Sequence, residues 1–256
     1  MQRKAELETL KRLSEKAIKL QQEKKYMEAL TCMERGLVMR QHFFGSDSDE
    51  VWEACKTTGE LCNFLAMAKL QEGETKIVEQ LLKKAEILHQ NDEVGQAVTF
   101  NNLACFYRTQ GKTKAALMYL KKTLRIESTL DTVDNPGDTH LNMCAVLSEL
   151  GRHKQALGHA NQALILLQDE LFSPGEDGEQ KKIPSDRLRV LAIAYHNIGV
   201  ENEFLGSYGK AISTYEKGLK LAEAHLGAEH GICDTLRSSL AEARKAASKK
   251  NNRRGK

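Results

Sequence analysis

The sequence predicts an all-α fold assembled from tandem pairs of helices. The 256-residue chain is rich in alanine, leucine, lysine and glutamate, whereas it has only three prolines and 5% aromatic residues, a composition that favours helices over strands. Five segments also share one pattern, in which an apolar helix is followed by a short polar break and a second helix. Such self-similarity indicates a repeat architecture, and the length is sufficient to bury a core.

The five segments align on the residue at their break. This residue is lysine once and glycine four times, at intervals of 38 to 55 residues: Lys24, Gly73, Gly111, Gly151 and Gly206. Glycine takes a positive φ at little cost and therefore ends the first helix of each pair. Five residues after each break stands a small or β-branched apolar residue, which lets two helices cross closely: Ala29, Val78, Ala116, Ala156 and Ala211. Nine residues after the break stands a second apolar position, which fills the space between turns: Met33, Leu82, Leu120, Ala160 and Tyr215.

The elements follow in order along the chain. Helix pairs are expected at 2–43, 48–90, 94–128, 137–171 and 185–225. The first pair has a lysine instead of a glycine at its break, and the acidic turn GSDSDE introduces the second. The stretch 171–186 carries two prolines and two glycines, so it is expected to be a loop inserted between the fourth and fifth pairs. A last helix at 229–248 has no partner and is expected to shield the fifth pair, and the basic residues 249–256 are expected to be a disordered tail.

The third segment, NNLACFYRTQGKTKAALMYLKKTL, resembles the tetratricopeptide repeat. The residues that match are Leu103, Ala104, Tyr107, Gly111, Ala116 and Leu120. The fourth and fifth segments match in the same way, and the resemblance covers nearly the whole chain. Units longer than the standard repeat, with stretches such as HLGAEHGICDTLRSSLAEA (225–243), are similar in style to those of the kinesin light chain. The resemblance implies a right-handed α-α superhelical solenoid of about five helix pairs with a C-terminal capping helix, a single domain over residues 1–248.

Asparagines recur at one place in the repeat. With the break numbered 15, Asn102, Asn142 and Asn197 fall at position 6, and Asn63 and Asn101 fall at position 5. In the family the first helices line a concave groove, and the resemblance implies that asparagines there bind the backbone of an extended peptide, since an amide both donates and accepts hydrogen bonds. The alternative is that these amides cross-link neighbouring helices.

Four further side chains are expected in this groove. Phe64 and Met67 make part of the wall apolar, which suits a ligand helix or an apolar anchor. Arg108 either meets a ligand carboxylate or is a solvated surface residue, and His196 completes the set. The family's clamp for a C-terminal carboxylate is incomplete, because Ser14 and Ile18 stand on the first helix in place of its basic and amide residues.

Other function classes find no support in the sequence. The net charge of +3 is too small to predict specific nucleic-acid binding, and no apolar run is long enough for a membrane span. The six cysteines lack disulfide or CxxC spacing and are expected to be reduced. Neither the eight histidines nor any other residues form an HExxH, zinc, GxSxG or phosphate-loop motif, so no metal, cofactor or catalytic residue is predicted.

The sequence therefore predicts a non-catalytic scaffold that binds an extended or helical peptide segment of a partner protein in its groove. The alternative is a structural subunit of a cytoskeletal assembly, microtubular or ciliary, which docks through its outer surface or its basic tail. The expected location is the cytoplasm for the first function, and the cytoskeleton or cilium for the second.

Overall fold

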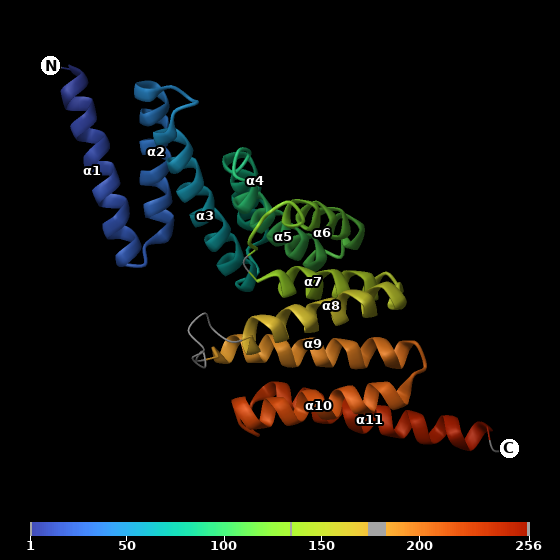
Figure 1. Ribbon diagram of the computed structural model, residues 1–256. Coiled ribbons are helices and arrows are strands. Elements are labelled where there is room, and N and C mark those ends of the chain that lie inside the picture. The colour runs from blue at the N-terminus through green and yellow to red at the C-terminus, as the bar shows by residue number, and fades with distance from the viewer. Residues whose placement is uncertain (1, 134, 174–182, 255–256) are drawn as a thin grey trace. The chain divides into compact units, whose positions relative to one another are not determined.

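The computed structural model describes residues 2–133, 135–173 and 183–254 (Figure 1). These residues form eleven α-helices and no strand, an all-α helical repeat solenoid. The helices are α1 (Gln2–Gln22), α2 (Tyr26–Phe44), α3 (Asp49–Gln71), α4 (Thr75–Leu88), α5 (Glu93–Thr109), α6 (Thr113–Glu127), α7 (Pro136–Glu149), α8 (His153–Phe172), α9 (Ser185–Phe204), α10 (Tyr208–Leu226) and α11 (Gly231–Arg254). None of them combines the length and hydropathy that crossing a bilayer requires.

The chain divides into two compact units. The first, Met1–Asp131, holds α1 to α6, and the second, Thr132–Lys256, holds α7 to α11. Within each unit every helix packs against the next one in the chain. The single solenoid over residues 1–248 stays a prediction. The loop predicted at 171–186 falls largely on residues 174–182, which lie outside the described residues.

Every predicted break has the positive φ that glycine favours, although one of the five residues is a lysine. The residue at the break has φ between 60° and 81° in all five repeats, including Lys24 at 60°. The following backbone N–H then donates to the carbonyl five residues earlier, as from Lys112 to Tyr107 at 2.9 Å. The same closing bond recurs in the other four repeats, so one local motif ends every first helix.

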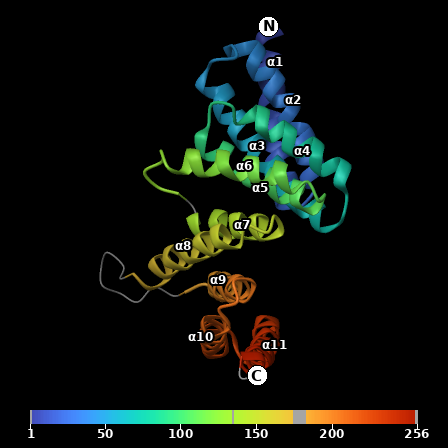
Figure 2. The same ribbon diagram turned by 90° about the vertical axis from the view of Figure 1, so that its right-hand side faces the viewer.

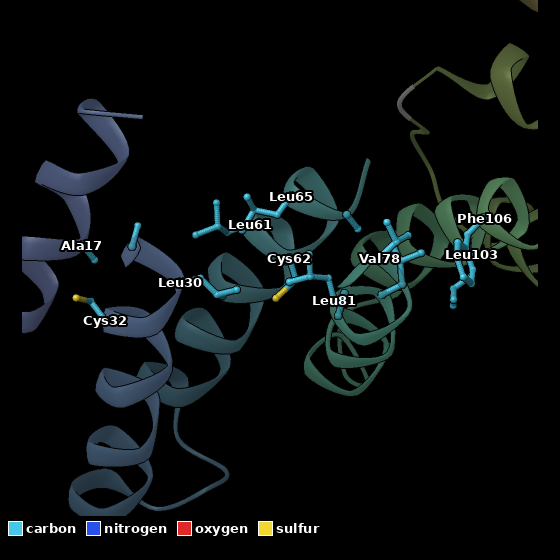
Figure 3. Close-up of a cluster of buried hydrophobic side chains, with 14 of the residues drawn as sticks. Ala17, Leu30, Cys32, Leu61, Cys62, Leu65, Val78, Leu81, Leu103 and Phe106 are labelled. Atoms are coloured by element: carbon cyan, nitrogen blue, oxygen red, sulfur yellow. The ribbon is translucent and has the colours of Figure 1, made fainter. Parts of the chain in front are cut away.

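The core of the first unit is a continuous row of apolar side chains from α1 to α5. Figure 3 shows this row between Ala17 and Phe106. The residues five positions after the break, Ala29, Val78 and Ala116, have no exposed surface, and Leu82 and Leu120 at nine positions are also fully buried. The repeat alignment made from the sequence therefore identifies packing positions that are fully buried, except Met33, which is half-buried.

The second unit packs one unusually large side chain. Tyr215 of α10 is fully buried and stands nine residues after the break, where the other repeats carry Met, Leu or Ala. Its ring fits because Gly199 of α9 lacks a side chain: a Cβ there would lie 2.2 Å from Cε1 of Tyr215. The Tyr215 hydroxyl donates to Oε1 of Glu203 at 2.6 Å.

At the start of α9, Arg187 donates to Asp138 of α7 at 2.9 Å and to Glu170 of α8 at 2.6 Å, which ties three helices together.

The last helix lies alongside α10, which Figure 2 shows nearly end on, and it also contacts α9. Its buried side chains are Cys233, Leu236, Leu240 and Ala243. Near its end, Lys250 Nζ donates to the carbonyl of Gly206 at 2.8 Å and lies 5.3 Å from the centre of the Tyr208 ring. The helix continues through Arg254, past residue 249 where the sequence predicts a disordered tail. Lys250 explains part of this difference, because it ties the helix to the α9–α10 turn; residues 255–256 lie outside the described residues.

Candidate functional site

The asparagines of the first unit join two neighbouring first helices. Asn63 of α3 is only 5% exposed, and its Nδ2 donates to Thr99 Oγ1 of α5 at 2.8 Å. Its Oδ1 accepts a hydrogen bond from Nδ2 of Asn102, at 3.2 Å. The amide of Asn63 is therefore used inside the protein, as in the cross-linking alternative, and it holds Asn102 in place.

A fully buried histidine continues this network. His89, the residue that follows α4, has Nδ1 3.0 Å from Thr99 Oγ1 and Nε2 3.2 Å from the carbonyl oxygen of Lys56 in α3. Because a carbonyl only accepts, Nε2 carries a hydrogen. The ring fits against α3 only because residue 59 is glycine, where a Cβ would lie 2.3 Å from Nε2. A polar chain thus runs from Asn102 through Asn63 and Thr99 to His89, and no pattern in the sequence indicates it.

The position-6 side chains are half-buried or exposed. Phe64, at this position in α3, is 52% exposed, and its ring meets Tyr26 of α2 edge-on at a centroid distance of 4.9 Å. Asn102 of α5 is half-buried, as are Asn101 and Met67. Arg108, in the last turn of α5, is exposed, and both it and Asn101 have contacts within the protein.

The first unit has an open hollow between α1 and α3. Whereas α3 packs against α5, no Cα of α1 comes within 8 Å of a Cα of α3. The hollow has a volume of about 420 Å³, and α2 forms its floor with Cys32, Met33 and Gly36. Ile18 of α1, which is 57% exposed, contributes to one wall. Arg40 of α2 also lines the hollow and donates a hydrogen bond to Ser14 Oγ of α1 at 3.0 Å. The sequence places Ser14 and Ile18 on the first helix, but it gives no sign that α2 contributes the floor.

The predicted residues of the second unit are half-buried. Asn142 lies on α7 and has contacts within the protein. His196 and Asn197 lie on α9, and Nε2 of His196 is 3.1 Å from Ser239 Oγ of α11. Burial lowers the pKa of His196, so the neutral imidazole is favoured there. The two units hold their predicted residues separately, and each set is a candidate contact surface by itself.

Three other histidines of this unit, His140, His153 and His159, lie against a second titratable side chain. Nδ1 of His140 in α7 lies 2.9 Å from Nδ1 of His159 in α8, and burial together with the neighbouring ring lowers the pKa of His140 to about 4. Nδ1 of His153 lies 2.9 Å from Oε2 of the buried Glu201. Among the described residues, no three histidine, cysteine, aspartate or glutamate side chains come together in a way that could hold a metal ion.

Two segments of the chain match family models, both described as tetratricopeptide repeat. They are residues 96–136 and residues 192–225, which correspond to the third and fifth repeats. No curated protein matches the sequence.

Several solved structures share the fold. A structure of BtubC (BKLC) from P. vanneervenii is 20% identical with a TM-score of 0.64, and the match covers 87% of this chain and 84% of that one. The MamA protein is 16% identical with a TM-score of 0.53, covering 88% of this chain and 97% of that one. A signal-transduction ATPase with a tetratricopeptide repeat sensor from Pyrococcus horikoshii is 16% identical with a TM-score of 0.59, covering 92% of this chain but 31% of that one. At these identities the matches show the fold alone.

Proposed function

Because the chain is a tetratricopeptide-repeat protein, we propose that it is a non-catalytic interaction scaffold which binds a peptide segment of a partner protein on its first helices. The observation that carries this proposal is the hollow of about 420 Å³ between α1 and α3. Its volume lies in the range of small ligand sites, and its walls are side chains of first helices.

The hollow suits an apolar anchor side chain of the ligand. Leu13, Ala17 and Ile18 line it from α1, and Met33 lines it from α2. Methionine is unbranched and polarizable, so it adapts to ligand side chains of different shape. Ser14 and Arg40, joined by their hydrogen bond, supply polar groups beside the anchor.

The asparagines would bind the ligand backbone. The bond to Asn63 uses one hydrogen of the Asn102 amide, whereas the amide has two donors and an acceptor. Asn101, Asn142 and Asn197 supply further amides, while Phe64, Met67 and His196 shape the surface around them. Arg108 would pair with a ligand carboxylate. Asn63 is assigned the role of orienting Asn102, since its own amide is buried.

A comparison of partner binding tests the proposal. Asn102, Asn142 and Asn197 are replaced together by Ala, and Ile18 is replaced by Lys in a second variant. Proximity labelling followed by a direct binding assay with the recovered partner should show a loss of at least tenfold in affinity for each. The matched control is Asn161→Ala, an exposed asparagine on the second helix α8. Unchanged binding by both variants, with helix content intact, would reject the groove.

That outcome would favour docking through the outer surface or the basic C-terminal end onto a cytoskeletal assembly. Lys245 and Lys249 of α11 are exposed, and a cluster of positive charge attracts acidic surfaces. Replacing both lysines by glutamate would then abolish cosedimentation with the assembly, whereas under the groove proposal it leaves partner binding unchanged.

A further inference from the structure

A second hollow lies in the first unit at the ends of the helices. Its volume is about 500 Å³, and it is bounded by the α2–α3 connection, the first turns of α3, the end of α4 and the α4–α5 connection. Two large apolar side chains stand in its walls with much of their surface in solvent: Trp52 is 48% exposed and Ile87 is 69% exposed. None of the position-6 asparagines lines it, and it shares one lining residue, Glu53, with the hollow between α1 and α3.

The rim of this hollow is acidic. Asp47, Asp49, Glu53 and Asp92 line it, against a single lysine, Lys56. All four carboxylates are solvent-accessible, and none of them forms an ion pair within the described part of the chain. Some acidic side chains elsewhere in the unit are paired, as Glu34 is with Lys84 and Glu79 with Lys83. The uncompensated charge therefore favours a positively charged occupant.

The walls of the hollow are held in position. His89 joins the end of α4 to the carbonyl of Lys56 in α3, and the N–H of Asp92 donates to the carbonyl of His89 at 2.9 Å. On the other side, the Ser48 hydroxyl accepts a hydrogen bond from the N–H of Val51 and donates to the carbonyl of Gly45 at 3.0 Å. A preformed site loses less conformational entropy when it binds, so these contacts favour recognition of a short segment.

We propose that this hollow, defined by Trp52, Ile87 and its four carboxylates, is a second docking site for a partner protein. It takes a linear segment that carries a bulky apolar side chain flanked by lysine or arginine. The apolar side chain packs between Trp52 and Ile87, and its basic neighbours pair with Asp47 and Glu53 on the rim. Tryptophan is enriched among the residues that dominate binding, and partly exposed aliphatic residues beside it supply the area that an anchor covers.

Selection from a phage-displayed library of random 12-residue peptides tests this proposal. The enriched peptides should combine an apolar anchor with lysine or arginine, and synthetic copies should shift the emission of Trp52, the only tryptophan in the chain. Ile87→Lys and Asp47→Lys should each weaken their binding at least tenfold. Binding should also weaken several-fold when NaCl is raised from 50 to 300 mM, because salt screens the rim charges.

Matched controls separate the hollow from the rest of the surface. Val38→Lys alters an equally exposed aliphatic residue on α2, and Asp131→Lys alters an exposed acidic residue outside a helix; neither lines the hollow. Both should leave the affinity unchanged, as should the triple asparagine variant of the groove. If the triple asparagine variant still bound the groove's partner, the groove proposal would be rejected, but the binding of the selected peptides to the hollow would be unaffected. The two proposals can therefore fail independently.

Three outcomes would overturn the proposal. The first is a pool without basic residues, and the second is binding that survives both Ile87→Lys and Asp47→Lys. The third is enrichment of sequences resembling the basic residues 245–256, together with a dimer in sedimentation that Ile87→Lys dissociates. In that case the occupant is a second copy of this chain.

Discussion

Tyr215 of α10 lies against the backbone of Gly199 in α9, so closely that a Cβ at residue 199 would come within 2.2 Å of its ring. The equivalent positions of the third repeat are Ala104 and Leu120, both buried. Where one helix carries a larger side chain at the crossing, the other carries a smaller one. The two residues of a crossing therefore depend on each other.

Gly199→Ala should destabilise the second unit by about 1–3 kcal/mol, because the added methyl group overpacks the crossing. Tyr215→Leu alone should also destabilise it, since the bond to Glu203 is lost. The double variant imitates the third repeat, and its loss should be smaller than the sum of the single losses by about 1 kcal/mol or more. Hydrogen exchange of α9 and α10 measures the loss of stability in the two single variants and the double variant. Additive losses would contradict direct packing of Tyr215 against Gly199.

Lys24→Gly should stabilise the first unit. Lys24 has φ 60°, where the other four repeats have glycine, and an L-residue with a side chain is strained in that region. The free energy gained by relieving this strain exceeds the entropic cost of a more flexible unfolded chain, so the free energy of unfolding should rise by about 0.5–1 kcal/mol. Urea unfolding followed by Trp52 fluorescence reports on this unit alone, since the chain has no other tryptophan. The reverse change in the third repeat, Gly111→Lys, should lower stability by a similar amount.

Thr99→Val should cost the first unit about 2–3 kcal/mol. Valine has nearly the same shape, but without the hydroxyl neither Nδ2 of Asn63 nor Nδ1 of His89 keeps its partner in the interior. The matched control is Thr31→Val, whose exposed hydroxyl bonds only to the carbonyl of Met27, four residues earlier. Unfolding curves for the two variants should differ clearly, and equal midpoints would show that the buried network adds nothing to stability.

The second unit should become less stable in mild acid. The folded pKa of His140 is about 4, well below that of an unfolded histidine, so the unfolded chain binds more protons between these values. Stability is therefore complete above about pH 6.5 and falls as the pH drops toward 4. The loss at pH 5 should be about 1 kcal/mol after allowance for solvent screening of this partly exposed ring.

Replacing His140 and His159 together by glutamine should remove most of this pH dependence. His196 contributes in the same direction, because burial lowers its pKa also, so a small slope should remain. Hydrogen exchange of α7 and α8 at pH 5 and pH 7 provides the measurement. A slope unchanged in the double variant would assign the acid sensitivity to other groups.

The repeat alignment could be predicted from the sequence because it depends on local chemistry. A residue with positive φ must stand at each break, and the residues five places later are buried wherever the two helices cross. The family resemblance then supplied the pairing of helices. The end of α11 was predicted too early, since Lys250 bonds to Gly206, a residue 44 positions away.

The candidate site was predictable only in part. Repeat numbering placed Phe64 and Asn102 on accessible positions, but it could not show that Asn63, one residue earlier, is buried against Thr99. The hollows depend on which helices fail to touch, and their floors and rims come from segments that no shared motif connects. Burial and cavity shape are properties of packing between distant residues, so they are defined only in the folded structure.

Each turn from a first helix to a second helix has three residues, whereas the connections from a second helix to the next first helix range from four to twelve. Variation in connection length is therefore confined to the connections that follow a second helix, with four residues at both in the first unit and with twelve and four residues in the second. For protein engineering, this identifies where a fluorescent tag or an extra domain can be inserted without shifting the helix register. Over evolutionary time, the same connections are where related chains can diverge in length while the three-residue turns stay constant.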